Sequence, residues 1–236
     1  MLAWLTLGFI IGLQHALEAD HVAAVGTLVV DKTGIRRIAG HGAIWGLGHT
    51  LTLAAFGGAV FAFRLSIDES LASGLELLVG LMLILLGGRL LHRLFRDRVH
   101  FHFHRHGANV RHLHAHSHRG EAGAHRVGNH DHAHSGSGWM RTFLVGTMHG
   151  LAGSAAIVAL TASTSDSIIP GLLFILIFGA GSIGGMALLS MAIAIPLSIS
   201  ARSLTSLHRG LELLAASFAC GLGIVLVYTN TGAIAA

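Results

Sequence analysis

The side chains best suited to chemistry gather within seven residues near the start of the chain. His15, Glu18, Asp20 and His21 lie in a segment that is otherwise mostly apolar. An ionisable group at the centre of a membrane helix is costly, about 2.5–3.5 kcal/mol for Asp on insertion scales. Packing alone does not require these residues, whereas a transition-metal cation needs nitrogen and oxygen ligands. We interpret the segment as part of a metal site.

Three further polar residues fall near the middle of other apolar segments: His49, His149 and Ser182. For His149 alone, a hydrogen-bonded contact between helices is an equally good interpretation. His41, His92 and His208 lie nearer the ends of their segments, where a solvated surface position is favoured. We therefore predict metal ligands among His15, Asp20, His21, His49 and His149.

Helix geometry restricts how these residues could share one ion. On an ideal helix His15 and His21 stand about 120° apart around the axis and about 9 Å apart along it. Asp20 lies about 140° from His15 on the same wheel. Either the helix is broken near residues 16–19, which would free backbone carbonyls as ligands, or the residues form successive stations for the ion.

The composition points to a membrane protein. Of 236 residues, 53% are hydrophobic and 11% are charged, and the mean hydropathy is +0.69. The single cysteine, Cys220, excludes an internal disulfide and any multi-cysteine metal centre. Six apolar segments are long enough to cross a bilayer: Leu2–Val30, Gly40–Phe63, Leu71–Leu94, Trp139–Ala162, Ile168–Ile195 and His208–Tyr228. The expected fold class is an all-α membrane protein.

The basic residues predict the orientation. Fourteen of the fifteen Lys and Arg residues lie in the first, third and fifth loops, and only Arg64 lies on the other side. The positive-inside rule then places those loops in the cytoplasm and both termini outside, as in a multi-pass protein of a bacterial-type cytoplasmic (inner) membrane. The net charge of +4 is explained by these loops, so no nucleic-acid partner is expected. We expect no removable signal peptide, because the N-terminus lacks a basic n-region.

Three motifs recur in the same order in the two halves of the chain. The segment from Phe9 to Leu17 parallels Phe143 to Leu151, Trp45–His49 parallels Phe178–Ser182, and Gly74–Leu78 parallels Gly210–Leu214. Each repeat holds three spans, an odd number, so the second copy would enter the membrane from the opposite side. We predict two inverted three-helix repeats, residues 1–95 and 139–236, with a substrate site where they meet.

The intervening residues 96–138 differ in composition. Twelve histidines lie between His100 and His134, separated mainly by Gly, Ser, Arg and Ala. Such a segment is expected to be disordered without metal, and its imidazoles suit borderline cations, including Zn²⁺. A merely polar linker is the alternative. The predicted metal-collecting residues are His100, His102, His104, His106, His112, His114, His116, His118, His130, His132 and His134.

Several polar residues are candidates for a secondary or gating role. Glu76 and Glu212 are repeat mates near the N-terminal ends of their spans, where stabilisation by the helix dipole is the alternative interpretation. Ser182 is the repeat mate of His49, and Ser154 takes the place of Asp20 in the second repeat. Glu18 completes this group.

These motifs resemble a known family. His15-Ala-Leu-Glu-Ala-Asp20-His21 resembles the H-x-x-x-x-D-H signature of the nickel/cobalt transporters (NiCoT), and Leu47-Gly-His49-Thr50 resembles the following L-G-H-S element. The segment from His149 through Ser154 to residue 156 resembles H-G-L-A-G-S-A-A of the compact, urease-cluster nickel permeases (UreH type). The eight-helix members carry acidic elements that are missing here, which favours the compact relatives. The resemblance implies that His15, Asp20, His21 and His49 select the metal, with His149 as a further ligand.

The sequence thus predicts a permease that moves Ni²⁺ or Co²⁺ through the membrane, with uptake favoured and efflux as the first alternative. A membrane metal sensor or chaperone, or an intramembrane metalloenzyme, is the second. We expect no enzymatic activity and no catalytic cofactor; the metal is cargo. A cytosolic metallochaperone is a possible partner beside the lipid bilayer, and the oligomeric state is left open.

Overall fold

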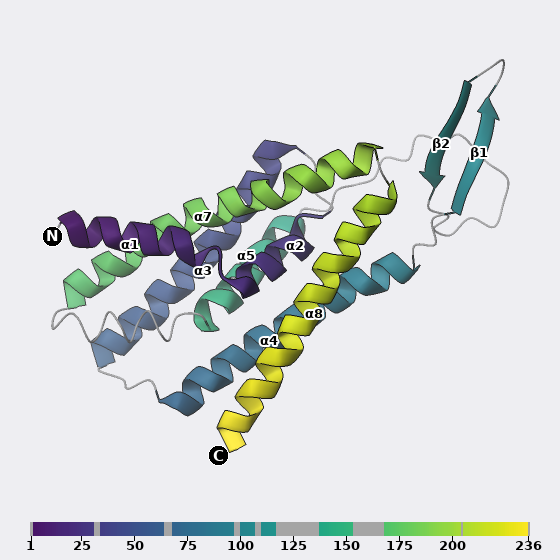
Figure 1. Ribbon diagram of the computed structural model, residues 1–236. Helices are drawn as coiled ribbons and strands as arrows, with labels where there is room; N and C mark the ends of the chain where they lie inside the picture. The colour runs from purple at the N-terminus through teal and green to yellow at the C-terminus, as the bar shows by residue number, and fades with distance from the viewer. Residues whose placement is uncertain are drawn as a thin grey trace.

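The computed structural model describes residues 2–30, 34–63, 68–96, 100–106, 110–116, 137–152, 168–203 and 205–235. Helices account for most of this part of the chain, and a two-stranded hairpin and short turns for the rest (Figure 1). The helices are α1 (Leu2–His15), α2 (Ala19–Leu28), α3 (Ile35–Phe63), α4 (Glu69–Arg96), α5 (Ser137–Ala152), α7 (Ile168–Ser203) and α8 (Thr205–Ala235).

Four of the described helices contain segments long and apolar enough to cross a membrane: Ile35–Val60, Glu69–Arg96, Ile169–Leu197 and Leu207–Gly232. They correspond to the second, third, fifth and sixth predicted spans. The first predicted span is not one helix but two, α1 and α2. The fourth predicted span begins as α5, and its continuation beyond Ala152 lies outside the described residues.

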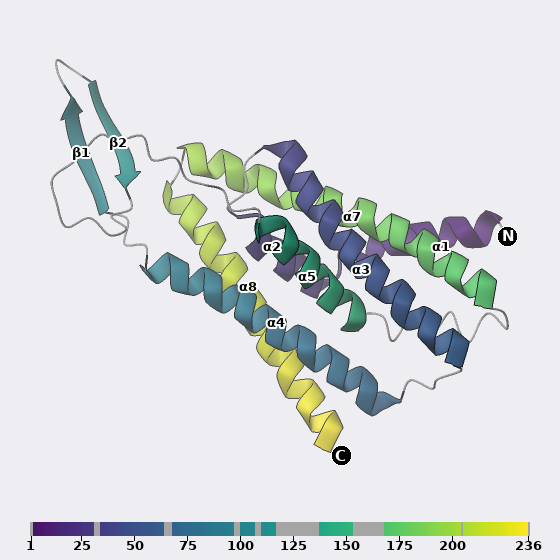
Figure 2. The same ribbon diagram turned by 180° about the vertical axis from the view of Figure 1, so that it is seen from behind.

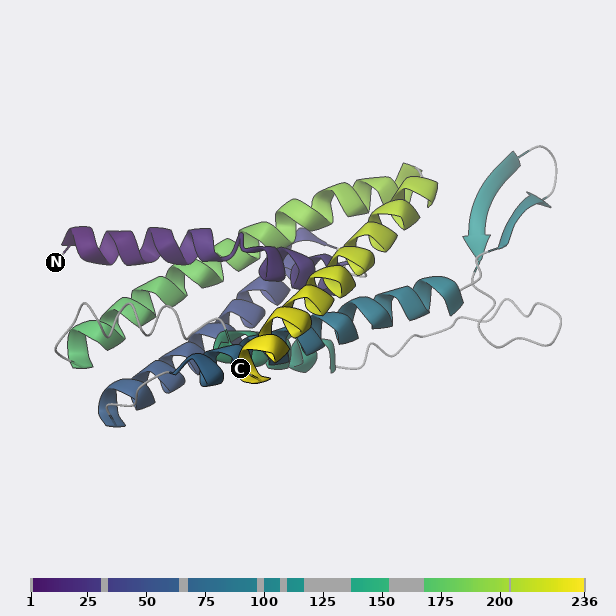
Figure 3. The ribbon, with the colours of Figure 1, turned by 60° about the horizontal axis from the view of Figure 1, so that its bottom comes forward.

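The helices pack in pairs that join the two halves of the chain. α3 lies against α7, and α4 lies against α8, while α1 packs on α7 and α5 packs on α3. Figure 2 shows α3 and α7 running beside each other with α5 alongside, and Figure 3 shows α4 crossing α8. Each of these pairs combines an element before the histidine-rich loop with one after it.

Glycines allow the central helices to approach closely. A Cβ atom added to Gly46 would lie 2.7 Å from the Cα of Ile183, and one added to Gly179 would strike the side chain of Thr50. The residue numbers rise along α3 as they fall along α7, so the two helices are antiparallel. Any larger side chain at these glycines would force the two backbones apart.

The structure describes two short segments of the histidine-rich loop, for which the sequence reasoning predicted no strand. Strands β1 (His100–His106) and β2 (Val110–His116) form an antiparallel hairpin that stands apart from the helices (Figure 1). The physical reason is the strict alternation of histidine with other residues, because a period of two is typical of a strand. His118, His130, His132 and His134 lie outside the described residues.

Candidate metal centre

The centre is built around an interruption between α1 and α2. α1 ends at His15, and the amide N–H groups of Leu17 and Glu18 donate to the carbonyls of Gln14 and His15 in a tight turn. Glu18 then adopts an extended conformation, with φ −61° and ψ 149°, before α2 begins at Ala19. Of the two alternatives left open by helix geometry, the structure therefore adopts the broken helix.

The break brings together residues that a continuous helix would separate. The ring centroids of His15 and His21 are 4.5 Å apart, and His49 lies 5.2 Å from His15 and 5.4 Å from His21. His149, which belongs to the second half of the chain, lies 4.2 Å from His21. All four rings are buried, with His15 the most exposed at 6%. We call these four residues the histidine cluster.

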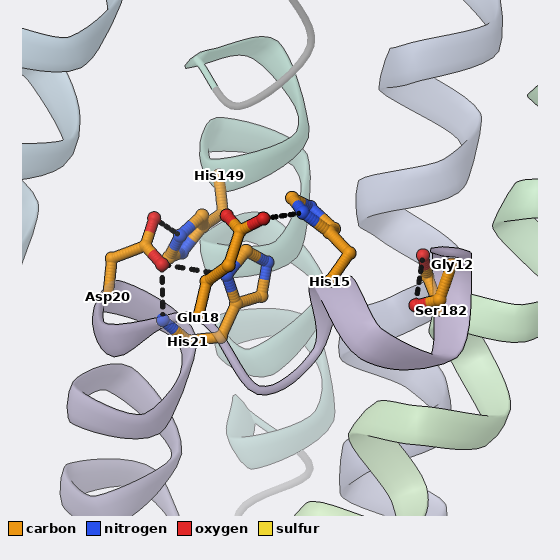
Figure 4. Close-up of polar contacts among 7 residues, drawn as sticks. All are labelled: Gly12, His15, Glu18, Asp20, His21, His149 and Ser182. Carbon is orange, nitrogen blue, oxygen red and sulfur yellow. Dashed lines mark hydrogen bonds and ion pairs between the residues drawn. The ribbon is translucent and has the colours of Figure 1, made fainter. Parts of the chain in front are cut away.

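Two carboxylates accept hydrogen bonds from rings of the histidine cluster (Figure 4). Nδ1 of His15 donates to Glu18 at 2.7 Å, and Nδ1 of His21 donates to Oδ1 of Asp20 at 2.9 Å. The second oxygen of Asp20 accepts from Nε2 of His149 at 2.8 Å. Because an ionised carboxylate only accepts hydrogen bonds, each of these ring nitrogens must carry its proton.

In the three rings bound to a carboxylate, the other ring nitrogen therefore carries a lone pair when the imidazole is neutral. Nε2 of His15, Nε2 of His21, both ring nitrogens of His49 and Nδ1 of His149 are buried without a hydrogen-bond partner in the described part of the chain. A buried polar atom left unpaired costs about 1–3 kcal/mol. A divalent cation bound here would supply the partner that these atoms lack.

Two groups of three residues have the spacing of a metal site. His15, His21 and His49 form one, and Asp20, His21 and His149 form the other, with one ligand atom from each residue within 4.8 Å of the rest. In the second group, hydrogen bonds already join Asp20 to both histidines. The first group offers imidazole nitrogens that are still open, so it is the better cradle for an ion.

Two aromatic rings border the cluster, and the sequence reasoning did not assign a role to either. Trp45 lies 5.6 Å from His149, and Phe178 lies 5.2 Å from His15, measured between ring centroids. Trp45 and Phe178 are repeat mates, and this equivalence could have identified them from the sequence. Ser182, one turn after Phe178, donates to the carbonyl of Gly12 at 3.1 Å instead of facing the imidazoles as a ligand.

The position of His41 differs from the prediction. It was predicted at a solvated surface, but it is buried, stacks on Trp139 at 3.9 Å and donates from Nδ1 to Thr142 at 2.9 Å. The reason is tertiary: α5 packs across the start of α3 and covers this ring.

The remaining residues predicted for a secondary or gating role differ in their burial. Glu212 is buried and pairs with Arg93 at 3.3 Å, whereas its repeat mate Glu76 is exposed. Both residues lie seven positions into their helices, beyond the first turn where the helix dipole acts most strongly. Glu18 keeps a 56% exposed side chain despite its bond to His15. Ser154 lies outside the described residues.

Comparison with known proteins gives one relative over most of the chain. The urease accessory protein UreH of Bacillus sp. (strain TB-90) is 35% identical over 205 residues, which span 86% of this chain and 82% of the relative. No protein-family model matches the chain, and no solved structure matches it. The relative is an accessory protein by name, in agreement with the expectation that this chain is not an enzyme.

Proposed function

Because this chain belongs to the UreH family of urease accessory proteins, as its resemblance to UreH-type permeases predicted, we propose that it is a permease for Ni²⁺ or Co²⁺. The ion would bind in the histidine cluster, between the two halves of the chain. Movement of one half against the other would then expose the cluster to the opposite side of the membrane.

The observation that carries this proposal is the set of open nitrogens on His15, His21 and His49, buried in an apolar bundle. Neutral imidazole suits borderline metals such as nickel, cobalt and zinc, while magnesium and calcium prefer oxygen ligands. Glu18 and Asp20 would act from behind the rings of His15 and His21, holding these two imidazoles in the tautomer that presents Nε2 to the ion. Asp20 would also offset part of the ion's charge.

Close contacts between the helices support the proposed inverted repeats. A Cβ added to Gly12 would strike the carbonyl of Phe178, and one added to Gly146 would strike the carbonyl of Trp45. Gly12 and Gly146 are repeat mates, and so are Phe178 and Trp45.

A second pair of contacts follows the same rule. A Cβ on Gly48 would meet the carbonyl of Phe143, and one on Gly181 would meet the carbonyl of Phe9. Gly181 is the repeat mate of Gly48, and Phe9 is the repeat mate of Phe143. Each contact therefore has a counterpart in which the two halves of the chain exchange roles, as a two-fold axis in the membrane plane requires. In this proposal the chain crosses the membrane six times, with both termini outside and the histidine-rich loop in the cytoplasm.

The hairpin supports a metal-collecting loop. Its register sets His100 opposite His116, His102 opposite His114, and His104 opposite His112. Directly opposed positions in an antiparallel pair have Cβ atoms about 4.5–5.5 Å apart, a spacing at which two imidazoles can share one ion. The loop would receive metal that enters the cytoplasm, or pass it to a soluble metallochaperone.

Uptake is the favoured direction, because the relative is an accessory protein of urease and the resembled permeases supply nickel. Efflux uses the same cluster and the same loop. Cellular nickel in strains with and without the gene distinguishes the two, because the difference has opposite sign.

The decisive experiment measures ⁶³Ni²⁺ transport into proteoliposomes containing the full chain. Replacing His15 and His21 together by Ala should abolish transport, while His92→Ala, an exposed histidine on α4, should leave it unchanged. Unaltered transport by the well-folded double variant would refute the proposal. Deleting residues 100–134 tests the sensor alternative, because a permease keeps its core transport and a loop-based sensor loses its response.

A further inference from the structure

We propose that Trp45 and Phe178 are the two gates of this permease, closing opposite ends of the histidine cluster and opening in turn. The proposal deepens the transport function and rests on it, since gates have meaning only if an ion passes. It assigns a role to two apolar residues that supply no ligand.

Both rings touch the cluster, but at different histidines. The ring centroid of Trp45 lies 5.4 Å from His21 and 5.6 Å from His149. The centroid of Phe178 lies 5.2 Å from His15. The two aromatic side chains are among the largest fully buried ones in the described part of the protein. Each therefore fills space that a hydrated ion would need in order to reach or leave the imidazoles.

The register of α3 and α7 places the two rings on opposite sides of the cluster. Gly46 is level with Ile183, and Thr50 is level with Gly179. Trp45 precedes His49 by four residues, whereas Phe178, next to Gly179, is level with the residues just after His49. At 1.5 Å per residue the two rings are separated by about 9 Å along the helix axes, with His49 between them.

Each gate residue packs against a helix that carries a histidine of the cluster. Gly12 on α1 lies against the backbone of Phe178, three residues before His15. Gly146 on α5 lies against the backbone of Trp45, three residues before His149. A shift of α1 along α7 would thus carry His15 away from Phe178, and a shift of α5 along α3 would carry His149 away from Trp45. The two openings are separate movements.

The environment of Trp45 favours its movement. Its indole N–H is buried and has no hydrogen-bond partner among the described residues. Tryptophan usually finds a partner for this group when it is buried, so the closed position of the ring is not fixed by a polar contact. His41 lies one turn before Trp45 on α3 and is buried as well. Along α3, Trp45 therefore lies one turn after His41 and one turn before His49.

A single thiol between the rings tests the gates without any metal. His49 lies on α3 between the levels of Trp45 and Phe178 and contacts His15 and His21, so His49→Cys in a Cys220→Ala background places the reporter there. Right-side-out and inside-out vesicles containing the full chain are treated with a small, charged methanethiosulfonate reagent. The rate of labelling then reports access from each side of the membrane.

Opening one gate should admit the reagent from one side only. Trp45→Ala should accelerate labelling on the order of tenfold or more from the side of the histidine-rich loop, and Phe178→Ala similarly from the opposite side. Phe174→Ala is the matched control: it is a buried phenylalanine one turn earlier on α7 that packs on Trp4, 4.7 Å between ring centroids, and it should change neither rate.

Acceleration from the same side in both variants, or from neither side, would overturn the gates. If the alanine variants do not fold, Trp45→Phe and Phe178→Leu leave smaller openings and should give weaker accelerations with the same sidedness. Nickel binding by the unmodified chain is measured separately. Its absence would refute the proposed transport function, while the labelling rates would still decide whether the rings close the cluster.

Discussion

Asp20 and His149 are 129 residues apart in the chain, yet Oδ2 of Asp20 accepts a hydrogen bond from Nε2 of His149 at 2.8 Å. The same carboxylate accepts two hydrogen bonds from His21, one from its ring and one from its amide N–H. One acid on α2 therefore orients rings from both halves of the chain. This is the arrangement by which a carboxylate behind a histidine strengthens it as a metal ligand.

Replacing Asp20 by Asn should weaken nickel binding about 10–100-fold, the usual effect of losing a carboxylate behind a ligating histidine. The amide keeps the shape of the side chain but loses the charge and can present an N–H group to the rings. Titration of the purified protein with Ni²⁺ against a competing chelator measures the affinity. Glu69→Gln, which removes an exposed acid at the start of α4, should have no effect. Equal losses in both variants would mean that general charge, not orientation, is responsible.

The repeat-related glycines should respond alike to the same change. Gly12→Ala and Gly146→Ala each force a methyl group against a backbone carbonyl, and overpacking of this kind costs about 1–3 kcal/mol. Gly184→Ala meets nothing within 4 Å and should be neutral or slightly stabilising. Thermal unfolding in detergent compares the three variants. A large loss in only one of the repeat-related pair would contradict equivalent packing in the two halves.

Nickel affinity should decrease as pH is lowered, because protons compete with the metal for the imidazole nitrogens. The metal needs neutral imidazoles, so protons compete with it and binding releases them. The sign is fixed: more protons on the free protein mean weaker binding at low pH. Calorimetric titration in buffers of different ionisation enthalpy measures the number of protons released. An affinity that stays constant down to the pH at which the protein unfolds in acid would exclude imidazole as the principal ligand.

The hairpin should lose metal when its alternation is broken at constant composition. Exchanging residues 102 and 103, and likewise 104 and 105, moves two histidines to positions opposite Leu113 and Arg111 instead of opposite other histidines. In a background with His15→Ala and His49→Ala, the full chain should then bind fewer Zn²⁺ ions, as counted by calorimetry. Single replacements of His102 and His114 should be non-additive, because opposed positions share an ion. Unchanged binding would show that the tract acts by composition alone.

Much of the site could be identified from the sequence, because charged residues in apolar spans are costly and therefore informative. His15, Asp20, His21, His49 and His149 were all selected in this way, and the structure brings them together. His41 was misjudged, since nothing local to it reveals that Trp139 will cover its ring. The hairpin was missed because composition was given more weight than the period of two.

By itself the sequence determined the apolar helices, the pairing of motifs between the two halves, and the residue types that can hold a transition metal. These follow from local properties: hydropathy, spacing and the chemistry of each side chain. Only the tertiary structure decided the interruption after His15, the division of nitrogens between carboxylates and open positions, and the placement of Trp45 and Phe178. The break at residues 16–18 has no proline or glycine to produce it; packing of α1 on α7 and of α2 on α8 sets its geometry, and such contacts between distant segments cannot be read from neighbouring residues.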